Sequence, residues 1–317
     1  MTSLRQPVLY RPETTPDSGS AAAFGTFGEL LQGALPDGND FLVTMPISRW
    51  STATFRHDPD ADAVVVVPAH KTKSRRLVRL MLDRYGVRGG GTLLLDSDLP
   101  EGKGLASSSA DLVATARAVG RTIGVDPSPA EIETLLRGIE PTDGVMYAGV
   151  VAFHHREVRL RAHLGHLPPM TIVGIDEGGS VSTLRFNKRR KTFSPTTRDT
   201  YARLLATLSA AVRAGDTAAI GRVATESARL NQRFCPKRTL DRMIAICRAA
   251  GGLGVVTTHS GTALGVLLDD SRPGHHDRLE WTKQACAAVT GTVWVDRSLP
   301  GDGQPQVYPP ADSARAV

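Results

Sequence analysis

The sequence predicts an α+β fold made of two domains. Its 317 residues are enough for two domains of ordinary size, each with a buried core. Short segments rich in β-branched residues and bounded by turn residues are typical of strands. Segments with apolar residues at a spacing of three and four are typical of helices. Both kinds of segment occur in each half of the chain, so we expect an α+β arrangement in both.

The first half starts with a glycine-bordered segment, GTFGELLQG (25–33). In the segment 74–86, apolar residues recur at helical spacing and Gly86 follows them, which predicts a helix. Another helix is expected to begin near Ser108, and a third to end at Pro141. By composition and turn boundaries, the expected strands are 41–47, 51–57, 63–68, 91–100 and a pair within 149–160.

The second half restarts the pattern after a cluster of turn residues, GHLPPM (165–170). A β segment is expected at 170–179. Helices and strands then alternate, with helices at 197–215, 217–234 and 238–251 and strands at 253–259, 262–269 and 292–296. The expected domains are a disordered lead at 1–22, an N-terminal domain at 23–165, a C-terminal domain at 166–298 and a loose tail at 299–317.

Composition excludes several classes of protein. Apolar residues make up 41% and charged residues 22% of the chain, as in soluble globular proteins. No apolar run approaches the roughly 20 residues that span a bilayer, and the N-terminus lacks the apolar stretch of a secretory signal, so we expect a cytoplasmic protein that binds no membrane. The three cysteines lack paired spacing, which argues against a disulfide framework or a cysteine zinc site.

The net charge of +6 makes nucleic acid a partner to consider. The dense basic runs are limited to HKTKSRRLVRL (70–80) and FNKRRK (186–191), and only 5% of residues are aromatic. The chain therefore offers few aromatic side chains on which bases could stack. We expect no nucleic-acid partner, and a basic face that is solvated or that attracts a polyphosphate.

A glycine- and serine-rich turn, EGKGLASSSAD (101–111), leads into the helix near Ser108. Ser108 and Asp111 have the spacing of a capping box, which would explain one serine. The preceding Gly102 and Gly104 let the backbone approach a ligand closely, at a helix start where free amides and the helix dipole favour phosphate. The segment is neither a Walker A loop nor a dinucleotide GxGxxG motif.

The segment PEGKGLASSSA (100–110) resembles the phosphate loop of the GHMP small-molecule kinases. GTFGELLQG (25–33) resembles the family's substrate-side motif, and GGLGVVTTHSGTALGVLL (251–268) its C-terminal glycine-rich motif. The resemblance implies a ribosomal-protein-like N-terminal domain and a ferredoxin-like C-terminal sandwich. Within the family, further likeness to the L-threonine kinases of the cobalamin and propanediol-utilisation pathways is carried by IEPTDG (139–144), DEGGSVSTLRFN (176–187), SARLNQR (227–233) and HSGTALGVLLD (259–269).

The resemblance implies an enzyme that uses ATP and Mg²⁺ to phosphorylate a hydroxyl group. It assigns Asp143 to accepting or orienting the acceptor proton, and Ser108 to binding Mg²⁺. A second metal carboxylate is expected nearby, with Glu133 ranked ahead of Glu131 and Glu140. The residues expected to bind the triphosphate are Gly102, Lys103, Gly104, Leu105, Ala106, Ser107, Ser108 and Ser109.

Recognition of the acceptor is expected from both halves of the chain. If the first motif turns helically, Glu29 and Gln32 point the same way and can recognise an amino group or a hydroxyl. Arg233 is a candidate for the substrate carboxylate, because arginine binds carboxylates well. Ser260 and Gly261 are expected to form the floor beneath the transferred phosphate, while His259 has no assigned role.

Two positions depart from the threonine-kinase pattern. Phe27 stands where a cysteine is expected, and Gly144 follows Asp143 where a hydroxyl residue is usual. Both are expected near the substrate, so they leave the identity of the amino acid open. L-threonine comes first, with L-serine or another hydroxylated amino acid as the alternative.

Two further possibilities stay open at this point. The chain could be a GHMP kinase for a sugar or an isoprenoid alcohol, which the threonine-kinase-like segments of the second half disfavour. It could also be a basic nucleic-acid-binding protein on a GHMP-like scaffold, which only its charge supports. The protein is expected to be a monomer or a homodimer.

Overall fold

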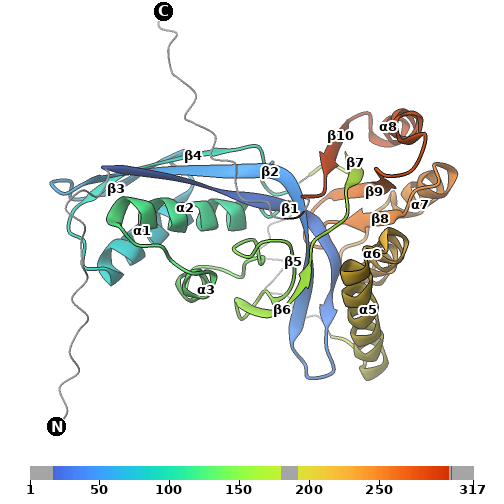
Figure 1. Cartoon of the computed structure of the whole chain (residues 1–317), viewed down its shortest axis with the longest axis horizontal. Coiled ribbons are helices and arrows are strands. Elements are labelled where there is room, and N and C mark those ends of the chain that lie inside the picture. Colours follow the sequence, from blue (N-terminus) through green and yellow to red (C-terminus); the bar gives the residue numbers. More distant parts are fainter. Residues whose placement is uncertain (1–16, 180–191, 300, 302–317) are drawn as a thin grey trace, which may run out of the picture.

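One mixed sheet of ten strands runs through both halves of the molecule in the computed structural model (Figure 1). The structure describes residues 17–179, 192–299 and 301. Eight strands follow the order β10-β7-β9-β8-β1-β2-β4-β3, and β5 and β6 branch from β2. The strands are β1 Ser18–Ala34, β2 Asp40–Asp58, β3 Val64–Val67, β4 Gly90–Ser97, β5 Val150–His154, β6 Arg159–Gly165, β7 Met170–Asp176, β8 Gly254–Thr257, β9 Ala263–Asp269 and β10 Val293–Arg297.

The long antiparallel strands β1 and β2 carry the N-terminal half. Helix α2 (Ser107–Ile123) packs against both of them, and its buried residues include Leu112, Val113, Ala116 and Val119. The shorter helices α1 (Thr72–Arg84) and α3 (Pro129–Arg137) lie on the same side of the sheet (Figure 1). Helix α2 is thereby fixed with its N-terminus toward the middle of the molecule.

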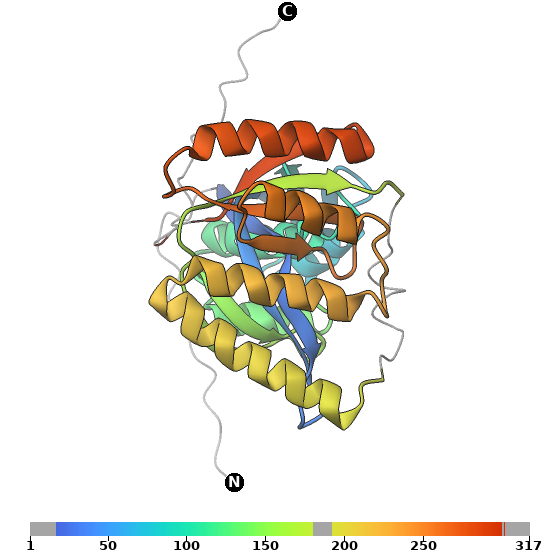
Figure 2. The ribbon, with the colours of Figure 1, turned by 90° about the vertical axis from the view of Figure 1, so that its right-hand side faces the viewer.

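Four helices cover the outer face of the C-terminal half, where they lie side by side (Figure 2). They are α5 Pro195–Ala214, α6 Thr217–Asn231, α7 Leu240–Ala249 and α8 His275–Thr290. Behind them, β7, β9 and β8 form an antiparallel ladder, and β10 pairs with β7. The predicted α+β class is confirmed.

The strands of the two halves are linked by a register pair between β1 and β8 and by an isolated bridge between Ile47 of β2 and Ser298. Glu29 of β1 pairs with Thr257 of β8. Beyond this pair, the chain after β8 runs through Thr258, His259 and Ser260 alongside β1. The two glycine-bordered motifs at 25–33 and 251–268 therefore meet at the centre of the molecule.

Some elements differ from the sequence-based expectations. Strand β1 begins at Ser18, which pairs with Arg56, so residues 18–22 belong to the sheet rather than to a disordered lead; residues 1–16 lie outside the described part of the chain. Helix α8 was not expected, because only Thr282 and Cys286 of its side chains are buried and no apolar stripe marks it.

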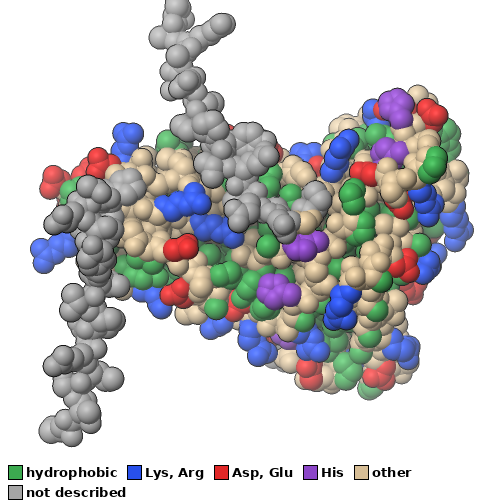
Figure 3. Space-filling model, in the orientation of Figure 1, with side chains coloured by type: hydrophobic (Ala, Val, Ile, Leu, Met, Phe, Trp, Pro, Cys, Tyr) green, Lys and Arg blue, Asp and Glu red, His purple; other side chains and the backbone are tan. Residues whose placement is uncertain are grey.

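The surface charges follow the balance of the composition. On the face in Figure 3, Lys and Arg side chains are scattered among Asp and Glu rather than gathered in one patch. The basic segment 186–191 lies outside the described residues. None of the described helices combines the length and the apolar character needed to cross a membrane.

Candidate active site

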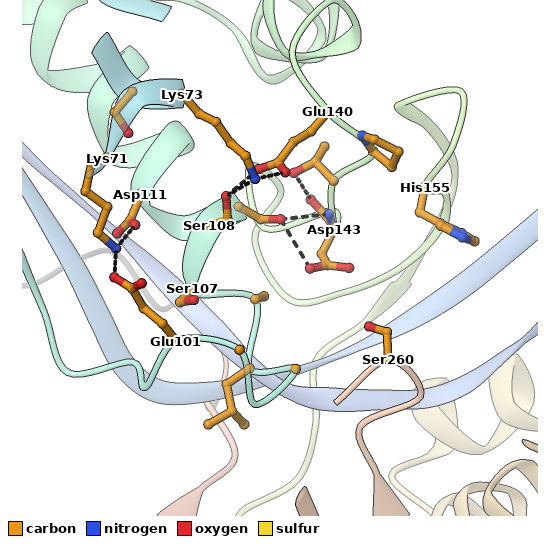
Figure 4. Close-up of a pocket in the computed structure, with 18 of the residues that line it drawn as sticks. Lys71, Lys73, Glu101, Ser107, Ser108, Asp111, Glu140, Asp143, His155 and Ser260 are labelled. Carbon is orange, nitrogen blue, oxygen red and sulfur yellow. Dashed lines mark hydrogen bonds and ion pairs between the residues drawn. The ribbon is translucent and has the colours of Figure 1, made fainter. Parts of the chain in front are cut away.

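A cavity of about 320 Å³ lies where the two halves meet. Its walls come from β1, the start of α1, the turn before α2, the first turn of α2, the segment after α3, and Ser260 beyond β8 (Figure 4). Most of the side chains that face it are polar or charged. A polar, partly enclosed cavity of this size suits a charged small ligand.

The glycine- and serine-rich turn forms one wall of this cavity. Gly102 and Gly104 have positive φ angles of 72° and 83°, and Ala106, at the N-cap of α2, has a φ of 59°. A Cβ on Gly104 would lie 2.6 Å from the Cβ of Thr258, so only glycine fits against the C-terminal loop. The predicted phosphate residues that line the cavity are Gly102, Gly104, Leu105, Ala106, Ser107, Ser108 and Ser109.

The helix after this turn begins at Ser107, close to the expected position, but the expected capping box is wrong. No side chain caps α2. Asp111 instead accepts hydrogen bonds from Ser51 Oγ, at 2.5 Å, and from Lys71 Nζ, at 2.6 Å. The first amides of α2 are therefore left without a side-chain cap, at the end of the helix that favours an anion.

Lys103 turns away from the cavity. Its Nζ pairs with Asp176 at 2.5 Å and donates to the carbonyl of Gly179 at 2.7 Å, and the residue is absent from the lining. Its backbone carbonyl contacts the C-terminal loop, where a Cβ on Gly261 would come within 1.9 Å of it. Gly261 thus supports the turn by close packing rather than by lining the cavity, whereas Ser260 lines it.

Ser108, Glu140 and Lys73 form a cluster inside the cavity (Figure 4). Ser108 Oγ donates to one carboxylate oxygen of Glu140, and Lys73 Nζ pairs with the other. Lys73 Nζ also lies 3.4 Å from Ser108 Oγ. The cluster combines a hydroxyl and a carboxylate, the hard oxygen donors that Mg²⁺ prefers, and Lys73 compensates the carboxylate charge.

Glu133 was ranked first as the metal carboxylate, and the structure does not bring it to the cavity. Glu133 is buried on α3, where its Oε1 accepts from Tyr147 Oη at 2.8 Å and from the Leu160 amide at 2.6 Å. Glu131 completes a capping box with Ser128 at the start of the same helix. Glu140 is the carboxylate beside Ser108, because it lies past the end of α3, where the chain turns into the cavity.

Asp143 faces the cavity from the segment that follows Glu140 (Figure 4). Ser109 Oγ donates to Asp143 Oδ2 at 3.2 Å, and the Asp143 amide donates to Ser109 Oγ at 3.1 Å. Burial, with the nearby carboxylates of Glu29 and Glu140, raises the pKa of Asp143 to about 7, although the hydrogen bond from Ser109 opposes this shift. A carboxylate with such a pKa can take a proton near neutral pH.

Glu29 and Gln32 both line the cavity, although they lie on a strand and not on a helix. Residues three apart on a regular strand point to opposite faces. The ladder between β1 and β2 shifts register between Glu29 and Leu31, because Leu30 is an extra residue on β1. This bulge restores the common direction of the two side chains.

The side-chain oxygens of Glu29 and Gln32 differ in their hydrogen bonding. Glu29 Oε2 accepts from the amide of His259 at 3.0 Å and from its Nδ1 at 2.9 Å. Gln32 is only 7% exposed, and its Oε1 has no hydrogen-bond partner among the described residues. A buried acceptor without a partner is costly, so a ligand that donates to Gln32 Oε1 would remove that cost.

Three other predicted positions lie away from the cavity. Arg233 is exposed and stacks over the Phe234 ring at 5.9 Å. Phe27 is fully buried in the C-terminal core, where Gly174 and Gly265 leave room for its ring. Gly144 packs so closely on Val151 that a Cβ would lie 2.5 Å from its Cγ2. Phe27 and Gly144 therefore serve packing and do not shape the cavity.

Several lining residues were not singled out individually in the sequence. Lys71 Nζ joins Glu101 of the glycine-rich turn, at 2.5 Å, to Asp111 of α2. With Lys73, it comes from the basic run at 70–80, whose density was the available signal. His155 follows β5 and lines the far side of the cavity (Figure 4), and nothing in its local sequence marked it.

Comparisons with known proteins agree with this architecture. The model of the GHMP kinases N terminal domain matches residues 73–152, and that of the GHMP kinases C terminal domain matches residues 208–286. The L-threonine kinase of Citrobacter freundii is 26% identical over 263 residues, which are 77% of this chain and 84% of that protein. The L-threonine kinase of Salmonella typhimurium is 26% identical over 256 residues, covering 77% and 81%.

The fold is also that of a solved small-molecule kinase. The crystal structure of homoserine kinase from Cytophaga hutchinsonii matches with a TM-score of 0.71 and 17% identity, over 92% of this chain and 97% of that one. One family model lies in each half of the chain, and the cavity lies between the segments that they cover. The chain belongs to the GHMP kinases.

Proposed function

We propose that the protein is an ATP-dependent kinase that phosphorylates the side-chain hydroxyl of a free amino acid, with L-threonine as the first candidate. The acceptor oxygen attacks the γ-phosphorus of ATP, and the bond from that phosphorus to the β–γ bridging oxygen breaks. The products are the O-phospho-amino acid and ADP, and the hydroxyl proton goes to Asp143. The acceptor hydroxyl must therefore lie between Asp143 and the γ-phosphate.

The uncapped start of α2 and the turn before it support triphosphate binding. Free amides at a helix N-terminus, preceded by glycines with positive φ, favour phosphate oxygens. Lys73 enters the cavity beside this helix start, and it can add a positive charge. Lys103 is turned toward Asp176, so in this proposal its side chain contributes nothing to the triphosphate.

Ser108 and Glu140 are the residues that would hold Mg²⁺. Their oxygen donors suit this ion, and Lys73 provides the cation that balances Glu140 without it. Mg²⁺ in nucleotide sites is usually held by one or two protein groups together with phosphates and water. When bound, Mg²⁺ neutralises charge on the phosphates.

The observation that carries the choice of an amino acid is the pair of buried acceptors beside Asp143. Glu29, Gln32 and Asp143 all line the cavity, the Glu29 carboxylate acts on the pKa of Asp143, and the buried Gln32 Oε1 has no hydrogen-bond partner among the described residues. The α-ammonium group of an amino acid such as L-threonine, two bonds from the hydroxyl-bearing carbon, would satisfy both acceptors. A neutral polyol would leave the buried Glu29 charge uncompensated.

L-threonine is placed first because two relatives of known name are L-threonine kinases, at 26% identity. L-serine and other hydroxylated amino acids carry the same ammonium group and are the alternatives. The expectations that the protein is cytoplasmic, binds no nucleic acid, and is a monomer or a homodimer stay predictions.

The test is turnover of ATP and Mg²⁺ with a panel of acceptors, with the new phosphate ester followed by phosphorus NMR. The panel contains L-threonine, L-serine, L-homoserine, galactose and mevalonate. We expect a phosphate ester with L-threonine, and a lower kcat/KM with the other amino acids. Galactose and mevalonate should give none, because they lack the ammonium group.

The matched pair of variants Asp143→Asn and Asp176→Asn separates the site from general effects of charge. Asp143→Asn should abolish turnover, whereas Asp176→Asn should keep it, because Asp176 contacts Lys103 and the Gly178 amide outside the cavity. Turnover of a neutral alcohol at a rate above that of every amino acid would contradict the proposal.

A further inference from the structure

We propose that Ser227 and His259, two buried residues of the C-terminal half, are positioning residues that determine recognition of the amino acid. This inference rests on the proposed function. The two residues act through Glu29 and Gln32, which face the cavity, and neither lines the cavity itself. Their role would be to hold the two acceptors of the ammonium group in place.

The first contact is between His259 and Glu29. The backbone amide and Nδ1 of His259 both bond to the same carboxylate oxygen, Glu29 Oε2, at 3.0 and 2.9 Å. The His259 side chain is 1% exposed and that of Glu29 is 8% exposed. Two bonds in a dry environment fix the rotation of the carboxylate, so that Oε1 can face the cavity.

The second contact is between Ser227 and the two other members of the network. The backbone amide of Gln32 donates to Ser227 Oγ at 3.2 Å, and Ser227 Oγ lies 2.8 Å from His259 Nε2. Ser227 is fully buried on α6. A single hydroxyl thus contacts both the backbone of Gln32 and the ring that contacts Glu29.

The direction of the bonds follows from the donors available. Ser227 Oγ accepts the Gln32 amide proton and has one proton of its own, which it can give to His259 Nε2. The other ring nitrogen, Nδ1, then carries a proton toward Glu29 Oε2. This assignment comes from the network of donors and acceptors, and it has Nδ1 donating to the carboxylate.

The arrangement resembles a serine–histidine–carboxylate triad, but it is built for support and not for nucleophilic catalysis. Ser227 Oγ is occupied by the Gln32 amide and has no access to the cavity. A substrate in the cavity therefore cannot reach Ser227 Oγ. The network instead orients Glu29 and the β1 bulge that carries Gln32.

The test compares Ser227→Ala, His259→Asn and the double variant with wild type, and uses Ser209→Ala as the matched control. Like Ser227, Ser209 lies on a helix. Its Oγ donates to the carbonyl of Leu205, and Ser209 does not line the cavity. The measurements are KM for L-threonine, KM for ATP, kcat, and the ratio of kcat/KM for L-threonine to that for 3-hydroxybutyrate, which lacks the ammonium group. Thermal melting reports whether each variant is folded.

We expect KM for L-threonine to rise by about tenfold or more in Ser227→Ala and His259→Asn, with KM for ATP within about twofold of wild type. The preference over 3-hydroxybutyrate should fall by a similar factor. Because the two residues act through the same carboxylate, the double variant should be less impaired than the product of the single effects predicts. Ser209→Ala should match wild type.

The inference is overturned if folded variants keep both the wild-type KM for L-threonine and the wild-type discrimination. It is also overturned if the two KM values and kcat change together, as a general loss of structure would make them do. Failure of the proposed function looks different, because wild type itself would then turn over no amino acid, and the inference would fall with it.

Discussion

Ser109 and Asp143 hold each other through two hydrogen bonds, one from the serine hydroxyl to Oδ2 at 3.2 Å and one from the Asp143 amide to the hydroxyl oxygen at 3.1 Å. This pair joins the first turn of α2 to the proposed base. In Figure 4, Asp143 lies next to the cluster of Ser108, Glu140 and Lys73. The residues proposed for the nucleotide and those proposed for the acceptor are thereby joined directly.

Ser109→Ala should move the acid limb of the kcat/KM profile to higher pH. The Ser109 hydrogen bond lowers the pKa of Asp143, so its loss raises that pKa above about 7. We expect a shift of about one pH unit, the size of a lost hydrogen bond to a charged group. Ser107→Ala is the control, since it lowers turnover without moving the midpoint; an unmoved midpoint in Ser109→Ala would contradict the assignment of Asp143 as the base.

Asp143→Asn should make the apoprotein more stable above neutral pH while it abolishes turnover. The folded-state pKa of Asp143 is raised by burial and by Glu29 and Glu140, so its contribution to stability is complete below about pH 4 and is lost as pH rises through about 7. Asparagine carries no charge at either pH.

Urea unfolding without nucleotide or Mg²⁺ measures this effect. At pH 8 the free energy of unfolding of Asp143→Asn should exceed that of wild type by at least about 1 kcal/mol. The difference should shrink between pH 7 and pH 4. A constant difference at all pH values would mean that the charge of Asp143 is not its origin.

Glu140→Gln and Glu133→Gln should fail in different ways, although both lie in or after helix α3. Glu140→Gln removes a charged donor beside Ser108, so the Mg²⁺ concentration for half-maximal activity should rise by about tenfold. Glu133→Gln weakens the bonds to Tyr147 and Leu160, so it should lower the melting temperature and leave the Mg²⁺ dependence unchanged. The reverse pattern would return the metal role to Glu133.

Phe27→Cys should lower stability without changing the order of substrates. The Phe27 ring is fully buried and lies 6.2 Å, centroid to centroid, from Trp294, so truncation leaves a cavity in the core that costs about 3 kcal/mol. The acceptor panel should give the same ranking as wild type, while thermal melting shows the loss. A changed ranking would mean that position 27 shapes the acceptor end after all.

The fold class and most elements could be predicted from local patterns. Leu77, Val78, Met81 and Leu82 recur at helical spacing because one face of α1 is buried, and this burial is visible in the order of residues. Helix α8 escaped prediction because it buries almost no side chains and so has no apolar stripe. Strand β1 escaped because bulges interrupt its alternation.

By itself, the sequence determined the glycine-rich turn before α2 and the position of Asp143 after a helix stop. Gly102 and Gly104 suit the backbone conformation of the turn, so short-range patterns marked these positions, while the roles proposed for them came from the resemblance to the GHMP kinases. Only the tertiary structure decided which glutamate stands beside Ser108, that Lys103 turns away, and that Phe27 packs in the core. Those facts depend on contacts between residues tens or hundreds of positions apart, such as Glu29 with His259, and no local pattern encodes which distant side chains share a cavity.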